Sequence, residues 1–167
     1  LNVVTSVEGY IVNYANGAYG AVEGNVQVGN KTFASLVDAI NAAQDGDVVV
    51  VLKSHTINGA NFVATNNFGY DALIVVDGKN ITIDFNGNTV TVAPDATNAN
   101  GGIAGVLEAV IFVENGATLT LKDSVGNGGF NVESEDNLYS FVYNCGSTVV
   151  FENGTYNVAA TTAGGSL

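Results

Sequence analysis

The chain has 167 residues, enough for one domain with a buried core, and its formal net charge is −12 at pH 7. Its four basic residues are all lysines, so it has little with which to neutralise phosphates, and we expect no nucleic-acid partner. Hydrophobic residues make up 47% of the chain, yet no apolar run approaches the roughly 20 residues of a membrane span. We therefore expect no membrane insertion.

Residues 1–25 differ from the rest of the chain and contain glycines that divide them into short segments. The pattern predicts an N-terminal arm or a set of cap strands. Tyr10, Tyr14 and Tyr19 lie in this segment.

Residues 35–43 are predicted to form the only helix. Leu36, Ala39 and Ile40 fall on one face of it, and either Thr32 or Ser35 offers an oxygen for the N-cap. Its apolar stripe is narrow, so the helix needs another element to pack on.

Four similar segments follow, each marked by a glycine: Gly46, Gly78, Gly116 and Gly146. They recur at intervals of roughly 30 to 40 residues, and the residues after each glycine alternate between apolar and polar. Aligning the glycines places like residues in columns, and these columns predict the core. The first column contains Val49, Ile81, Leu119 and Val149; the second contains Val51, Ile83, Leu121 and Phe151; a third, on the preceding strands, contains Leu73, Ile111 and Phe141.

A stack of parallel coils explains these columns, because each coil would repeat the same inward positions. We therefore predict an all-β, right-handed parallel β-helix of about four coils over residues 26–158, with the helix 35–43 capping its N-terminal end. Residues 159–167 are predicted to be a flexible tail or linker. Several Asn-Gly and Asp-Gly pairs leave an antiparallel sandwich of hairpins as the alternative.

The stretch 26–57 (VQVGNKTFASLVDAINAAQDGDVVVVLKSHTI), with 79–92 (KNITIDFNGNTVTV), resembles the entry segment of pectin-lyase-like β-helix proteins. The branch in question is common on the surfaces of Gram-positive gut bacteria, and the resemblance covers about residues 26–158. Similar segments occur in phage virion fibres and capsid decoration proteins. The matching residues are Phe33, Leu36, Ala39, Ile40, Asp45, Gly46, Asp47, Ile83, Asp84, Phe85, Asn86 and Gly87.

The enzymes of that family act on polysaccharides, with an Arg or Lys base in the lyases and clustered Asp residues in the hydrolases. This chain has no arginine, and its best carboxylate, Asp84, aligns with Lys122 and Glu152, which predicts an outward ion-pair column. His55 is the only histidine and has no catalytic partner motif around it. We expect no enzymatic activity.

No cofactor or metal is expected either. The acidic segment with Glu133, Glu135 and Asp136 matches no calcium-binding motif and is read as a solvated loop. Cys145, the only cysteine, cannot form an internal disulfide and is read as a small residue in a turn.

The remaining candidates for binding are aromatic residues outside the repeat. They predict a surface for a protein or glycan partner, or for assembly into a homo-oligomer. The expected function is a non-catalytic structural or adhesion module of an extracellular bacterial cell-surface protein. The alternative is a virion decoration or fibre protein, expected to be trimeric and attached through its N-terminal arm. The candidate residues are Tyr10, Tyr14, Tyr19, Phe62, Phe68 and Tyr70.

Overall fold

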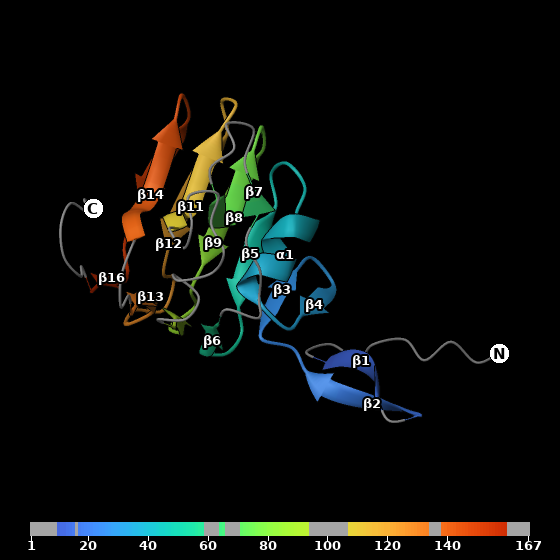
Figure 1. Ribbon diagram of the computed structural model, residues 1–167. Helices are drawn as coiled ribbons and strands as arrows, with labels where there is room; N and C mark the ends of the chain where they lie inside the picture. The colour runs from blue at the N-terminus through green and yellow to red at the C-terminus, as the bar shows by residue number, and fades with distance from the viewer. Residues whose placement is uncertain are drawn as a thin grey trace.

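The computed structural model describes residues 10–15, 17–58, 64–65, 71–93, 107–133 and 138–159. This part of the chain is mostly β-structure with one short helix, α1 (Leu36–Ala42) (Figure 1). The strands before the helix are β1 (Tyr10–Ala15), β2 (Ala18–Glu23), β3 (Val26–Val28) and β4 (Lys31–Phe33). Those after it are β5 (Val48–Val51), β6 (His55–Ile57), β7 (Ala64–Thr65), β8 (Asp71–Asp77), β9 (Asn80–Asp84), β10 (Thr89–Val92), β11 (Leu107–Glu114), β12 (Thr118–Lys122), β13 (Gly129–Val132), β14 (Leu138–Cys145), β15 (Thr148–Phe151) and β16 (Thr155–Val158).

The described strands form four sheets. The hairpin β1–β2 is a sheet of its own, and the six-stranded sheet has the order β15-β12-β9-β5-β3-β4. Two four-stranded sheets have the orders β16-β13-β10-β6 and β14-β11-β8-β7. The strands of the repeated segments pair in parallel, β9 with β12 and β10 with β13, so the hairpin sandwich does not describe them.

The predicted fold class, a right-handed parallel β-helix of about four coils, is wrong. The structure has separate sheets, and antiparallel pairs occur among them: β3 pairs with β4 and β5, β7 pairs with β8, and β1 pairs with β2. The two residues between β3 and β4 can join only antiparallel neighbours. The repeat therefore predicted the parallel pairing among its own segments, but not the antiparallel pairs, which involve the strands before the first repeated segment and the short strand β7.

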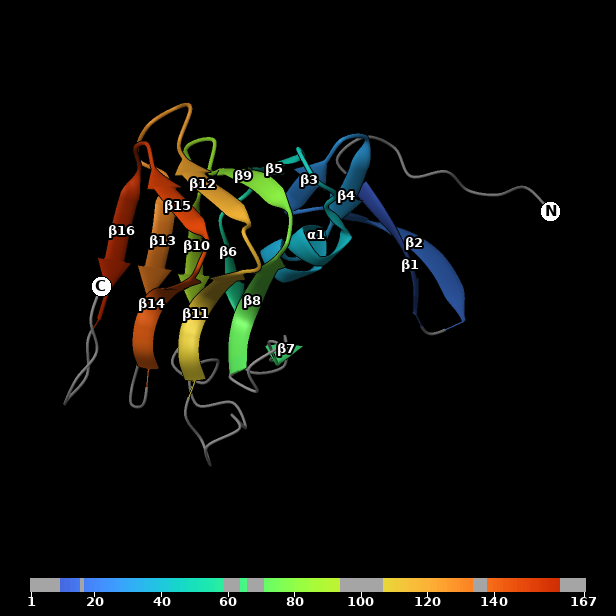
Figure 2. The same ribbon diagram turned by 90° about the horizontal axis from the view of Figure 1, so that it is seen from above.

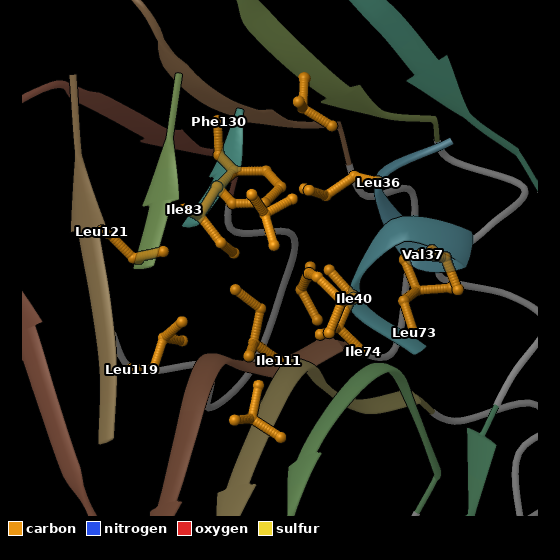
Figure 3. Packing of buried hydrophobic residues seen from close by; sticks show 14 of the residues in the cluster. Leu36, Val37, Ile40, Leu73, Ile74, Ile83, Ile111, Leu119, Leu121 and Phe130 are labelled. Carbon is orange, nitrogen blue, oxygen red and sulfur yellow. The ribbon is translucent and has the colours of Figure 1, made fainter. Parts of the chain in front are cut away.

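Helix α1 begins at Ser35, which settles the choice of N-cap: the Ser35 side chain accepts the N–H of Asp38 at 3.2 Å. The helix packs against β3, β4, β5 and β8. Leu36 and Ile40 are completely buried and point into the same cluster as Ile83 and Ile111 (Figure 3). Within the described residues, no helix is long and apolar enough to cross a membrane.

The C-terminal end of α1 is held by a lysine from a distant loop. Lys79 Nζ donates to the carbonyl oxygens of Ile40 at 2.8 Å and Ala43 at 3.0 Å. A cation here satisfies carbonyl groups that have no partner within the helix and complements the helix dipole. Burial lowers the pKa of Lys79, and the charges of Asp47 and Asp77 oppose that effect.

The two predicted core columns after the glycine are correct for three segments. Leu119 lies opposite Ile81 and Val149, and Leu121 lies opposite Ile83 and Phe151. The remaining segment, the one that begins at Gly46, is displaced by two residues, because Val49 lies opposite Ile83 rather than Ile81. A shift of two preserves the face of a strand, so Val49 and Val51 are still completely buried.

The column predicted on the preceding strands is wrong by one residue. Ile111 of β11 lies opposite Ile74 and Val142, not Leu73 and Phe141. The corner between β11 and β12 contains one residue more than the corner between β8 and β9 or that between β14 and β15. Asn115 and Gly116 in this longer corner both have positive φ. Apolar residues on both faces of β8 and β11 are buried, so the hydrophobic pattern did not indicate this register.

The predicted burial of the core columns is also wrong at the last strand of the six-stranded sheet. Leu119 and Leu121 of β12 are completely buried, whereas Val149 of β15 is half-buried and Phe151 is 50% exposed. Strand β15 is the edge of the sheet, so these two residues have a neighbour on only one side in the part of the chain that is described.

Candidate functional site

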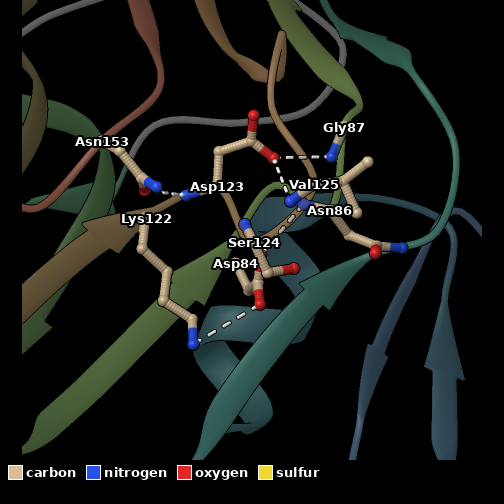
Figure 4. Close-up of polar contacts among 8 residues, drawn as sticks. All are labelled: Asp84, Asn86, Gly87, Lys122, Asp123, Ser124, Val125 and Asn153. Atoms are coloured by element: carbon tan, nitrogen blue, oxygen red, sulfur yellow. Dashed lines mark hydrogen bonds and ion pairs between the residues drawn. The ribbon is translucent and has the colours of Figure 1, made fainter.

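The carboxylate singled out from the sequence, Asp84, ends β9 and is only 8% exposed. One oxygen, Oδ1, accepts the N–H groups of Asn86 and Ser124, each at 3.0 Å. The other, Oδ2, lies 3.6 Å from Lys122 Nζ (Figure 4), which confirms the predicted pairing with the neighbouring strand, but the predicted outward position is wrong because Asp84 is buried. Asp84 therefore holds two turns in place, and Glu152, the third member of the predicted column, is exposed.

A second carboxylate, Asp123, lies one residue further on at the same corner and is 1% exposed. It accepts the N–H groups of Gly87 at 2.6 Å and Gly128 at 2.7 Å (the Gly87 bond is drawn in Figure 4). Burial raises the pKa of Asp123. The hydrogen bonds that it accepts from backbone N–H groups lower the pKa, and their combined effect is larger, so the pKa lies below its usual value.

The corner continues to the next strand through Asn153, whose Oδ1 accepts the N–H of Asp123 at 2.6 Å. The hydroxyl of Tyr156 donates to the Asn153 carbonyl at 2.7 Å. Burial first, and the charge of Asp123 second, raise the pKa of this tyrosine to about 12. Asp84, Asp123 and Asn153 thus form a ladder of side chains that fixes the chain where successive strands turn.

The side-chain oxygens of this corner ladder accept hydrogen bonds from backbone N–H groups of the protein itself. A general acid or base must be able to exchange a proton with a substrate within hydrogen-bond reach. Asp84 and Asp123 instead accept backbone N–H groups at positions that are nearly closed to solvent. Asp123 and Asn153 were not predicted from the sequence; the available signal was an Asp or Asn within two residues of the ends of β12 and β15.

His55, the only histidine, stands at the start of β6 and links two backbone groups. Its Nε2 accepts the N–H of Leu36 at 3.2 Å, and Nδ1 donates to the Lys53 carbonyl at 3.0 Å. Burial lowers its pKa, and the hydrogen bond to Lys53 opposes that effect less strongly. The neutral ring is therefore a structural link to the helix.

The other predicted candidates are not brought together. Glu133 is exposed and accepts an amide hydrogen from Asn131 at 3.0 Å, while Glu135 and Asp136 lie outside the described residues. Cys145 is half-buried at the end of β14. Among the residues that the structure describes, no group of three or more His, Cys, Asp or Glu side chains is placed to hold a metal ion.

A shallow depression of about 190 Å³ lies between the β3–β4 hairpin and the end of α1. Phe33 and Val28 supply an apolar wall, and Lys31, Gln44 and Asp47 supply polar groups. Asp47 already accepts the N–H of Gln44 at 2.8 Å, so it serves to end the helix.

The predicted aromatic residues are only partly described. Tyr10 and Tyr19 lie on the hairpin β1–β2 and are 38% and 74% exposed. Tyr14 lies opposite Tyr19 in the same hairpin. Phe62, Phe68 and Tyr70 lie outside the described residues. The structure therefore brings together only the N-terminal part of the predicted surface.

Comparison of the chain with family models, with curated proteins and with solved structures gives no match. The resemblance to pectin-lyase-like proteins thus stays a prediction from the sequence.

Proposed function

We propose that this chain is a non-catalytic structural and adhesion module of a bacterial cell-surface protein, and that it binds a protein or glycan partner through the hairpin β1–β2. The single observation that carries the proposal is the exposure of Tyr10 and Tyr19 on a hairpin that extends from the rest of the molecule (Figure 2). Tyrosine combines a large apolar ring with a polar hydroxyl, which suits contacts with sugar rings and with protein surfaces.

The hairpin is attached at its base, so its position is defined. Thr32 Oγ1 donates to the carbonyl of Tyr10 at 2.9 Å, and Glu23 forms an ion pair with Lys53. A binding element that is already held in place loses less conformational entropy on binding than a free segment does.

The absence of catalysis is part of the same proposal. It is supported by the corner ladder, where Asp84 and Asp123 are used to hold backbone N–H groups. A panel of pectin, alginate, chondroitin and mixed glycans tests both halves in one set of samples. We expect binding without turnover; turnover that is lost in Asp84→Asn would contradict the proposal.

The binding half is tested with the double variant Tyr10→Ala/Tyr19→Ala. We expect it to lose affinity for any ligand of the panel by at least about tenfold, since tyrosine is enriched among the interface residues whose truncation costs about 2 kcal/mol or more. Val125→Ala shortens an apolar side chain in the loop between β12 and β13 that is about as exposed as Tyr19, and it serves as the control. Equal loss in both variants, or no loss in the double variant, would place binding elsewhere.

The same hairpin also supports the alternative setting, a virion protein that is attached through its N-terminal arm. Deletion of residues 1–24 separates the two roles. In the virion setting it abolishes attachment to the particle, while the far-ultraviolet circular dichroism of the sheets is retained. In the surface setting, the variant that lacks residues 1–24 instead loses its binding to the glycans of the panel.

A further inference from the structure

The two ends of the sheets are closed in different ways. At one end, α1 packs against β3, β4, β5 and β8, and Val49 and Val51 of β5 are completely buried. At the other end, Phe151 is 50% exposed, although its neighbour Leu121 in the same column is completely buried. The core therefore reaches solvent at β15 in the part of the chain that the structure describes.

The backbone of this end also has open hydrogen-bonding positions. The N–H groups of Thr148, the first residue of β15, and of Glu152, the residue after β15, donate towards β12 and the residue before it, each at 2.9 Å. Because alternate residues of a strand point their backbone groups to opposite sides, the N–H groups of Val149 and Phe151 face away from β12. Strand β15 is the edge of its sheet, so within the described part of the chain these N–H groups face no further strand.

Strand β16 repeats this arrangement in the neighbouring sheet. The N–H groups of Thr155 and Ala159 donate back towards β13, each at 2.9 Å, so those of Tyr156 and Val158 face outward. Strand β14 is the edge of the third sheet. The three edge strands lie together on one side of the molecule, opposite the hairpin β1–β2 (Figure 2).

These edges lack the usual protection against pairing with another chain. Strands β14, β15 and β16 contain no charged residue and no proline, although the chain carries a net charge of −12; the exposed Glu152 follows directly after β15. Exposed edges in natural proteins commonly carry a lysine, a proline or an inward-pointing charge. At the opposite end the edge strand β4 begins with Lys31 and has three residues. The exposed apolar side chains at the uncharged edges are Tyr143, Val150 and Phe151.

We propose that the edge strands β14, β15 and β16 are the surface on which a second copy of this chain docks, edge against edge. A two-fold interface needs only one patch that is complementary to itself, and a strand edge with outward N–H and C=O groups meets that requirement. Two copies that each carry −12 can approach most closely along strands that themselves carry no charge. The hairpin points away from this interface, so the inference is independent of the proposed binding role.

The test measures association of the full 167-residue chain by sedimentation velocity at rising concentration. We expect a monomer–dimer equilibrium. Val150→Lys places a charge on the edge of each copy and should weaken the dimer at least about tenfold, because like charges then meet across the interface. Val125→Lys adds the same charge to an exposed valine in the β12–β13 loop and should leave the dimer within about twofold of the parent. Circular dichroism confirms that both variants are folded.

Hydrogen exchange supplies a second readout. On dimer formation, the outward amides of Val149, Phe151, Tyr156 and Val158 should exchange more slowly. A chain that stays monomeric overturns the proposal. The proposal is also overturned if only a shortened chain that ends at Ala159 forms a dimer, because residues 160–167 would then cover the edges in the longer chain. Equal effects of the two lysine variants, or growth into long assemblies, would also overturn it.

Discussion

Nε2 of His55 accepts the backbone N–H of Leu36 at 3.2 Å, which joins the start of β6 to the first residue of α1. This bond requires a neutral ring, because a protonated imidazole has no lone pair to accept a hydrogen. The N-terminus of a helix also disfavours a nearby positive charge.

Stability should therefore depend on pH through His55. Its pKa in the folded protein lies below the ordinary value of 6.5, so the unfolded chain binds more protons in the interval between the two values. The contribution of His55 is complete above about pH 6.5 and is lost as the pH falls from there towards the folded pKa. Urea unfolding at about pH 7.5 and about pH 5.5 measures the loss. We expect His55→Gln to flatten this dependence; an unchanged slope would show that other groups cause it.

Removing the charge of Asp123 should destabilise the corner ladder. In Asp123→Asn one oxygen remains to accept an N–H, and the new amide group faces donors, so we expect a loss of about 2 kcal/mol in the free energy of unfolding. Asp45 also accepts a backbone N–H, that of Asn80 at 2.7 Å, but it is exposed. Asp45→Asn is thus the control, with an expected loss below about 1 kcal/mol. Equal losses would refute the special role of the buried carboxylate.

Acid should weaken the same corner. Because the folded pKa of Asp123 lies below its ordinary value of 3.8, its stabilising contribution is present above pH 3.8 and is lost as the pH falls through the folded pKa. Asp123→Asn has no carboxyl group at this position that could take up a proton. Its unfolding free energy should decline less steeply than that of the parent protein below about pH 4, as measured by urea titration.

The lysine that caps α1 offers a fourth test. Lys79→Met keeps the length of the side chain and removes both bonds to the helix carbonyls, which should cost about 1 kcal/mol at this half-buried position. Lys31 is exposed, and Lys31→Met makes the same change in net charge. Chemical unfolding of the two variants compares them directly. A larger loss in Lys31→Met would mean that net charge, not the cap, determines the outcome.

Gly129 should tolerate no side chain. Its φ is +154°, and a Cβ atom would stand 1.8 Å from the carbonyl oxygen of Thr155 on the adjacent strand. We expect Gly129→Ala to lose more than about 4 kcal/mol or to fail to fold, since backbone would have to move. Gly116 also has positive φ but faces open space, so Gly116→Ala should lose only about 1–2 kcal/mol. Thermal unfolding and soluble yield distinguish the two.

The sequence by itself determined which residues alternate and which segments are alike. From those two facts it predicted the helix over 35–43, the parallel pairing of Ile81, Leu119 and Val149, and the ion pair of Asp84 with Lys122. These features are local or repeat from segment to segment, so each copy of the pattern supports the same conclusion.

Only the tertiary structure decided the pairing of the strands outside the repeat and the register within it. The displacement of Val49 by two residues keeps the same face buried, and β8 and β11 bury both faces, so hydrophobicity does not distinguish the alternatives. The corner ladder was equally hidden, because Asp123 meets the N–H of Gly87 only when two strands that are far apart in sequence lie side by side. Exposure of Phe151 was decided in the same way: the residue is as apolar as Leu121, but its strand has no described neighbour on the outer side.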